Sequence, residues 1–413
     1  MKHYPLIHSR KDSILFGVFL FALLYITRNT MTASALIGIQ TAQFLTLGLM
    51  ALLGIGFLIR YRKEWKAIFT DGRIALLAVC TVVCLLPMLL KRDWQMMYIS
   101  VLLCMYYAIF FTYFISLQDL ARYYVMILAV VGAYSIFTAY VLRILPDHDI
   151  IPKPIMYNAI DYRFYYFGTY VPLNYVKTRN FGLFREPGVY QYFLTLALFL
   201  NNYVANWDSQ KKLWILNGIL AVTLLTTMAT GGVAGLCLFA VVLFFEKKLY
   251  RNKRAMALVI LLLLLLVLAV AVIVEQQGEL YWELYSMVIG KFTNSEAESA
   301  SDRVIAIMSD LKHFLQSPLT GAGIAEVLHA VDNNTTSTML MLAMFGIGGG
   351  ALHIGSWFAL VWSKNRKIWV NLGMIVITFL SFNTQNLIAD TFFWLFPLMA
   401  LTEWVLPKLQ KKE

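Results

Sequence analysis

The chain has 413 residues, of which 60% are hydrophobic and 14% are charged. Soluble domains are about half apolar and a quarter charged, so this composition indicates an integral membrane protein with several spans. The net charge of +11 would suit nucleic acid only if the basic residues formed one soluble face. They lie mostly in short connectors between apolar segments, the pattern that orients membrane proteins, so no nucleic-acid partner is expected.

The first apolar segment, residues 14–26, follows a short basic stretch. Small residues at 33–35 resemble a signal-peptide cleavage site. The polar residues 27–32 separate them from the apolar core, and a second apolar segment begins at once. We therefore interpret 14–26 as an uncleaved first span.

Apolar segments near the roughly 20 residues needed to cross the hydrocarbon recur along the chain. The four cysteines lie inside these segments, where sulfur acts as a small hydrophobe, and predict neither a disulfide nor a metal site. The sequence predicts an all-α, polytopic membrane helix bundle with about twelve transmembrane helices. The segments lie at 14–26, 34–59, 74–90, 97–115, 123–144, 189–204, 213–229, 232–246, 255–274, 337–362, 368–382 and 387–406.

The distribution of basic residues sets the expected orientation. With both termini in the cytoplasm, the cytoplasmic connectors hold 22 of the 34 Lys and Arg residues, as the positive-inside rule requires. The two long loops then lie on the same, extracytoplasmic side and meet over the outer mouth of the bundle. The expected order is helices 1–5 in 1–144, the first outer loop in 145–188, helices 6–9 in 189–274, the second outer loop in 275–336, and helices 10–12 with a cytoplasmic tail in 337–413.

The first outer loop is rich in tyrosine, and two interpretations stay open. Tyrosines at a membrane surface form an interfacial belt. Aromatic rings also stack on the C–H faces of sugars, which would make this loop a platform for a glycan. The tyrosines are Tyr157, Tyr162, Tyr165, Tyr166, Tyr170 and Tyr175.

Residues 179–188, with the sequence RNFGLFREPG, place Arg179, Arg185 and Glu186 directly before an apolar segment. Charges at the end of a membrane helix are costly to place against lipid, so we expect this stretch to face a substrate. Glu186 has two open interpretations. It is either a general base or orienting group, or the partner of Arg185 in a structural salt bridge at a helix start.

The second outer loop contains a predicted amphipathic helix. Apolar side chains repeat at helical spacing over 304–315, after a possible capping box at 299–302. Arg303 lies at the start of this helix, and Ser317-Pro318 ends it.

A glycine turn at 319–323 leads from that helix into a second short helix that carries His329. The loop closes on the polar residues 332–337, which begin with Asp332. The tenth span follows, and its glycines at 346–350 permit close approach by another segment.

No Walker loop, dinucleotide fingerprint or metal-ligand spacing occurs in a suitable context, so neither cofactor nor metal is expected. Arginine keeps its charge and offers a planar fork that grips phosphate bidentately. Arg179, Arg185 and Arg303 are therefore candidates to hold a pyrophosphate and to stabilise charge on a leaving phosphate. His353 and Asp390, in or beside the spans, are assigned hydrogen-bonded packing roles.

These motifs resemble a known family. Residues 179–188, entering a span, are similar to the first-outer-loop motif of bacterial polysaccharide polymerases of the Wzy type. The sequence SPLTGAG at 317–323, followed by a polar run and FGIGG at 345–349, is similar to the second-loop signature shared by O-antigen ligases and those polymerases. The motifs cover about 175–350, and the topology covers the whole chain.

The resemblance implies a GT-C-type, metal-independent glycosyltransferase at the outer face of the bacterial cytoplasmic (inner) membrane. Its donor and acceptor would be undecaprenyl-pyrophosphate-linked oligosaccharides, with a chain-length regulator and a flippase as further partners. Loop arginines hold the pyrophosphate in this family, a role that Arg179, Arg185 and Arg303 would inherit. A sugar hydroxyl also needs a proton acceptor, and Glu186, Asp332 and His329 are the candidate catalytic residues.

One departure from the family pattern favours a polymerase. Ligases place a His-Asn pair just before the span that carries the Gly-x-x-Gly pattern, whereas residues 332–337 contain no histidine. The close alternative is an O-antigen-type ligase that moves glycan to another acceptor. The alternative from another class is a lipid-glycan flippase or solute transporter, although transporters tend to carry charges or broken helices near the midplane.

Overall fold

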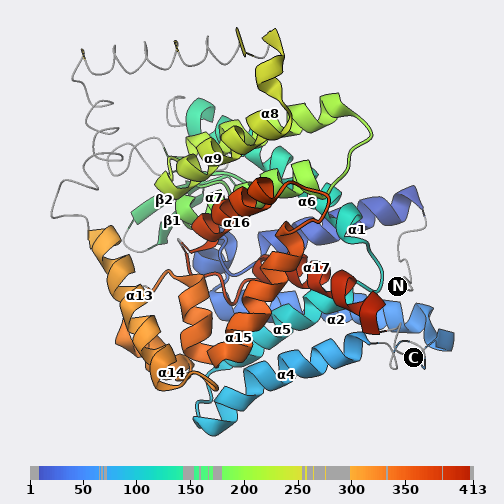
Figure 1. Cartoon of the computed structure of the whole chain (residues 1–413), viewed down its shortest axis with the longest axis vertical. Helices are drawn as coiled ribbons and strands as arrows, with labels where there is room; N and C mark the ends of the chain where they lie inside the picture. The colour runs from blue at the N-terminus through green and yellow to red at the C-terminus, as the bar shows by residue number, and fades with distance from the viewer. Residues whose placement is uncertain are drawn as a thin grey trace.

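The computed structural model describes residues 9–64, 66, 68, 72–142, 153–157, 160–165, 167–170, 179–253, 256–257, 264, 275, 298–331, 334–383 and 385–409. Within them the protein is a bundle of long, mostly apolar helices (Figure 1). The helices are α1 (Arg10–Tyr25), α2 (Ile39–Arg60), α4 (Arg73–Leu90), α5 (Met96–Phe111), α6 (Leu117–Ile136), α7 (Pro187–Tyr203), α8 (Gln210–Thr226), α9 (Thr230–Glu246), α13 (Glu298–Gln316), α14 (Ile324–Ala330), α15 (Ser337–Val361), α16 (Ile368–Phe382) and α17 (Thr391–Leu409).

A helix occupies each predicted apolar segment except 255–274, which lies almost wholly outside the described residues. Four helices in the described part are long and apolar enough to cross a membrane. They are α2, α4, α15, and α6 together with the π-helical turn η3 (Phe137–Leu142) that extends it. Shorter apolar helices include α5, α9, α16 and most of α17. The chain is therefore a polytopic helical membrane protein.

Helices α7 and α17 form the centre of the bundle. Every residue of α7 from Val189 to Asn201 is buried, as expected for a helix that is apolar on all sides. Ring contacts join it to α17, with Phe193 lying 6.0 Å from Phe392 between centroids. The residues that precede α7 and α17 are thereby held over the middle of one end of the bundle.

Hydrogen bonds that involve the described connectors and the helix ends beside them fall into two sets. One set joins connectors or helix ends on the predicted outer side: Arg185 N to Asn29 O at 3.1 Å, Asn180 N to Thr226 O at 2.8 Å, and Ser337 Oγ to Gln385 O at 2.6 Å. The other joins connectors or helix ends on the predicted cytoplasmic side: Arg122 Nε to Ala205 O at 2.6 Å, Leu117 N to Glu403 Oε1 at 3.1 Å, and Arg366 Nη2 to Tyr203 O at 3.3 Å.

This segregation is what an alternating topology requires, because successive connectors then gather at opposite ends. Figure 1 shows the same division: α13, α14, β1 and β2 lie at the left, whereas α1 begins and α17 ends at the right. Below, the left-hand end is called the mouth.

The all-α expectation needs a correction in the first outer loop. Three strands, β1 (Lys153–Tyr157), β2 (Ile160–Phe164) and β3 (Thr169–Tyr170), form a small antiparallel sheet in the order β1-β2-β3. The register pairs Tyr157 with Ile160 at the turn. Tyrosine, isoleucine and phenylalanine favour half-buried strands, and Tyr162 and Phe164 are buried here. The tyrosine content therefore also serves a sheet, which was not predicted.

The amphipathic helix and the short helix predicted in the second outer loop are confirmed as α13 and α14. The predicted capping box at 299–302 is wrong, since α13 already includes those residues.

The two glycine motifs contact each other directly. Helix α15 is kinked at Gly346, whose φ of 65° and ψ of −162° are essentially restricted to glycine. The turn after α13 packs into this kink, with Ile347 N donating to Pro318 O at 2.8 Å and Ala322 N to Ala343 O at 2.8 Å. A Cβ on Gly346 would lie 2.6 Å from Leu319 O. The glycines thus hold the second outer loop against α15.

The orientation predicts which connectors a membrane-impermeant thiol reagent can reach. In a Cys237→Ala background, which removes the one exposed cysteine of the described residues, Glu326→Cys should label from outside intact cells. Lys212→Cys should label only after the membrane is opened. Both positions are exposed, so the reverse pattern would overturn the orientation.

The glycine contact predicts a position-specific loss of stability. Gly346→Ala should destabilise the protein by roughly 1–3 kcal/mol from backbone strain alone, with the clash adding to it. Gly355→Ala on the same helix is the matched control, because a Cβ there meets nothing within 4 Å. The measurement is the fraction of monodisperse protein left after heating, and equal values for the two variants would refute this account.

Candidate functional site at the mouth

The connector between α1 and α2 runs alongside the RNFGLFREPG motif. Thr30 forms a β-bridge with Phe184, Met31 N donates to Leu183 O at 2.8 Å, and Arg185 N donates to Asn29 O at 3.1 Å. Two segments more than 150 residues apart in sequence are therefore tied by their backbones. This pairing places Arg28 next to Arg185.

Arg28 and Arg185 form a pair of like charges at the mouth. Burial and the charge of Arg185 lower the pKa of Arg28, against the opposing effect of Asp390. Within the described residues, neither guanidinium donates a hydrogen bond, and Arg185 Nε is buried. Buried donors without acceptors are costly, so this pair is suited to an anionic ligand.

Glu186 faces two of the predicted arginines. Its carboxylate is 3.9 Å from Arg185 Nε, too far for a hydrogen bond, and the side chain is 45% exposed. It occupies the N-cap position of α7, but its side chain makes no capping hydrogen bond. Burial lowers the pKa of Arg179, and Glu186 opposes that shift. Arg179, Arg185 and Glu186 are thus brought together, with Arg179 Nε donating to Thr227 O at 3.2 Å.

Asp390 ties the same connector to the start of α17. Thr27 Oγ1 and Asn29 Nδ2 donate to its Oδ2 at 3.0 and 2.8 Å, and Phe392 N donates to its Oδ1 at 2.9 Å. The contacts match the packing role assigned from the sequence.

The motif keeps its shape through Asn180 and Gly182. Asn180 is buried, donates to Ser135 Oγ at 2.9 Å and Thr226 Oγ1 at 3.0 Å, and accepts from Gly182 N at 2.8 Å. Gly182 has a φ of 56°, and a Cβ there would lie 2.5 Å from the Tyr190 ring. These contacts fix the path of the chain toward Arg185.

The second outer loop reaches the same region through its polar residues. Asp310 on α13 is buried and accepts from Asn334 Nδ2 and Thr336 Oγ1, each at 2.7 Å. Burial raises its pKa, and both hydrogen bonds oppose the rise. Ser337 then bonds to Gln385 O, and the Gln385 side chain lies against Gly188. The loop is thereby anchored next to the motif.

The remaining predicted site residues lie apart from this cluster or outside the described part of the chain. Arg303 on α13 and His329 on α14 are exposed and, among the described residues, make no ion pair or hydrogen bond with Arg179, Arg185 or Glu186. Asp332 lies outside the described residues. The described side chains include no group of three His, Cys, Asp or Glu residues suited to a metal ion.

Sequence reasoning missed Arg28. The available signal was a lone arginine in the polar connector TRNTMT, between two apolar segments and on the predicted outer side. Its proximity to Arg185 depends on the pairing of two distant connectors, which neither segment reveals alone.

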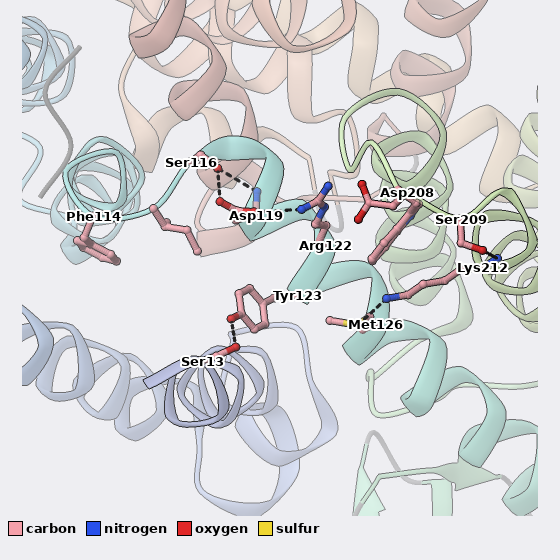
Figure 2. A pocket seen from close by; sticks show the side chains of 12 residues that line it. Ser13, Phe114, Ser116, Asp119, Arg122, Tyr123, Met126, Asp208, Ser209 and Lys212 are labelled. Atoms are coloured by element: carbon pink, nitrogen blue, oxygen red, sulfur yellow. Dashed lines mark hydrogen bonds and ion pairs between the residues drawn. The ribbon is translucent and has the colours of Figure 1, made fainter. Parts of the chain in front are cut away.

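A further cavity lies at the opposite end of the bundle. It measures about 760 Å³ and is lined by the connectors before α6 and α8 and by the start of α1 (Figure 2). Figure 2 shows Asp119 paired with Arg122, and Lys212 directed at Met126. Arg122 also donates to Ala205 O and Asn206 O. The guanidinium of Arg122 thus already has acceptors, unlike those of Arg28 and Arg185 at the mouth.

The Asn180 contacts predict a loss of stability on truncation. Asn180→Ala removes the acceptor for the buried Gly182 N–H, which should cost about 1–3 kcal/mol. Asn365→Ala, at an exposed connector position, should cost almost nothing. Thermal unfolding of the purified variants measures the difference, and an Asn180→Ala protein as stable as Asn365→Ala would contradict the assigned role.

The chain was compared with known proteins. Residues 215–340 match the family model described as O-Antigen ligase, a stretch that includes α13, α14 and the glycine turn. The RNFGLFREPG motif lies before the matched stretch. No curated protein and no solved structure matches the chain. The family match confirms the resemblance to the O-antigen ligase and polymerase superfamily.

Proposed function

We propose that the protein polymerises undecaprenyl-pyrophosphate-linked oligosaccharide repeat units into O-antigen, capsular polysaccharide or exopolysaccharide. The proposal includes about twelve spans in a GT-C-type arrangement, cytoplasmic termini, and a location in the bacterial inner membrane. The observation that supports it most is the pair Arg28 and Arg185 at the mouth, whose guanidinium groups donate no hydrogen bond within the described residues and lie beside Glu186.

In the proposed reaction the growing glycan is the donor, and a sugar hydroxyl of a new lipid-linked repeat unit attacks its anomeric carbon. The bond between that carbon and the pyrophosphate oxygen breaks, and the electron pair leaves with the lipid pyrophosphate. Arg28, Arg179 and Arg185 would hold this charge, because guanidinium donors fixed in place stabilise it without reorganising. Arg303 would join them only if α13 moved so that its exposed side chain reached the other arginines.

The hydroxyl proton must pass to a base. Glu186 is beside the arginines, and its proposed role is to orient a ligand rather than to abstract the proton. Asp332 and His329, in the second outer loop, are the candidates for direct abstraction. Each would act on the acceptor hydroxyl within hydrogen-bond reach.

The family match alone does not separate polymerase from ligase, and the missing histidine in 332–337 favours the polymerase. A ligase would move the glycan from the lipid pyrophosphate to a different acceptor. A flippase or transporter would move it without cleavage. A chain-length regulator and a flippase are the proposed partners of the polymerase.

The proposal predicts the behaviour of arginine variants with lipid-linked repeat units extracted from cells deleted for this gene. Arg185→Lys and Arg28→Lys should each lower the rate of chain extension about 10- to 100-fold, since a hydrogen bond to a charged group contributes about 1.5–3 kcal/mol. Glu186→Gln should also reduce the rate strongly. Product length on gels gives the readout, and Asp332→Asn and His329→Ala test the base.

Arg251→Lys, in an exposed connector at the other end of the bundle, is the matched control and should keep the parental rate. If Arg185→Lys and Arg28→Lys both extended chains at the parental rate, the arginines could not have the proposed role of holding the pyrophosphate. Transfer of the glycan off the lipid without lengthening would show a ligase instead. Glycan that crosses the membrane with its pyrophosphate bond intact would show a transporter.

A further inference from the structure

An apolar groove crosses the membrane-facing side of the bundle between α2 and α5. It measures about 510 Å³, is open along one side, and is lined almost entirely by apolar atoms. Gly48, Ala51 and Gly54 of α2 form one wall, where the absence of large side chains leaves the space. Residues from Leu103 to Phe110 of α5 form the other, over about 10 Å at the helical rise of 1.5 Å per residue, and Tyr113 follows in the turn after α5.

The groove is closed at the end away from the mouth. Phe57 of α2 packs edge-on against Phe110 with ring centroids 5.4 Å apart, and it contacts Tyr113 at 5.9 Å. This aromatic contact joins the two helices below the groove. An elongated ligand that lies in the groove must therefore extend toward the mouth.

A small cavity adjoins the groove at its other end. The two spaces share Leu47, Leu103 and Tyr107 as lining residues, and the second, of about 40 Å³, is also lined by Arg28. Within the described residues, the guanidinium groups of Arg28 and the neighbouring Arg185 donate no hydrogen bond. The apolar groove therefore adjoins the cationic pair.

We infer that this groove holds the isoprenoid chain of a polyprenyl pyrophosphate, with the pyrophosphate at Arg28 and Arg185. The inference rests on the proposed function and specifies where its lipid lies. Within a bilayer an apolar groove gains little from the hydrophobic effect, because lipid tails are equally apolar. Selectivity must then come from the anionic head group that contacts the arginines. A lipid that ends in pyrophosphate suits two arginines better than a bulk phospholipid does.

Gly48 allows the groove to be filled without disturbing the protein. A Cβ there meets nothing within 4 Å, and the same holds for Gly56 on the same helix, which does not line the groove. Gly48→Phe and Gly56→Phe therefore carry the same change in helix propensity and differ in whether the ring enters the groove.

The experiment is a native mass spectrometry titration of the purified proteins with undecaprenyl pyrophosphate, and separately with phosphatidylglycerol. Gly48→Phe should weaken undecaprenyl pyrophosphate binding at least tenfold, and Gly56→Phe should leave it unchanged. Arg28→Gln should also weaken it. Phosphatidylglycerol should bind all four proteins alike.

Equal binding of undecaprenyl pyrophosphate by the two phenylalanine variants would overturn the groove assignment, even if polymerisation is observed. The assignment would also be overturned if Gly48→Phe lost binding of phosphatidylglycerol but kept binding of undecaprenyl pyrophosphate. If the expected pattern appears but the protein neither extends nor transfers glycan, the groove stands and the proposed function fails. If the parent protein binds no undecaprenyl pyrophosphate, both fail.

Discussion

The complete burial of α7 is the constraint on which the site depends. A helix without a lipid-facing side is surrounded by other helices, so the residues that precede it emerge at the centre of the mouth. The backbone N–H and C=O groups of these residues need hydrogen-bond partners, because buried backbone groups are rarely left unpaired. The segment obtains them by pairing with the α1–α2 connector and by bonding to the end of α8. This backbone arrangement places Arg28 next to Arg185.

The same arrangement leaves charge unsatisfied at one place. Most buried polar groups at the mouth have partners, as Asp390 and Asp310 show, each with hydrogen bonds to both oxygens. Arg28 and Arg185 are different, since their nearest charged neighbours are each other, Glu186 and Asp390. In the described part of the chain, the mouth supplies hydrogen-bond donors to the buried carboxylates of Asp390 and Asp310 but leaves the guanidinium donors of Arg28 and Arg185 unused, an arrangement that suits an anion supplied from outside.

The features predicted correctly from sequence are those encoded locally. Apolar length marked the helices, and helical spacing of apolar residues marked α13. Pro187 and Gly188 were assigned to the outer loop, whereas α7 already begins at Pro187. The missed features depend on segments far apart in the chain. Arg28 becomes part of the site only because Thr30 pairs with Phe184, and the glycines at 321 and 346 acquire their role only where the two motifs dock. The β-sheet was missed because tyrosine at a membrane surface has a competing explanation.

The arginine pair is proposed to bind the pyrophosphate of a lipid-linked glycan. A structure of the protein with undecaprenyl pyrophosphate bound in a lipid nanodisc tests it most directly. The account predicts phosphate oxygens within about 3 Å of the guanidinium groups of Arg28 and Arg185, the distance of a charge-assisted hydrogen bond. Phosphate density in the cavity beside Arg122 and Lys212, with none between Arg28 and Arg185, would contradict it.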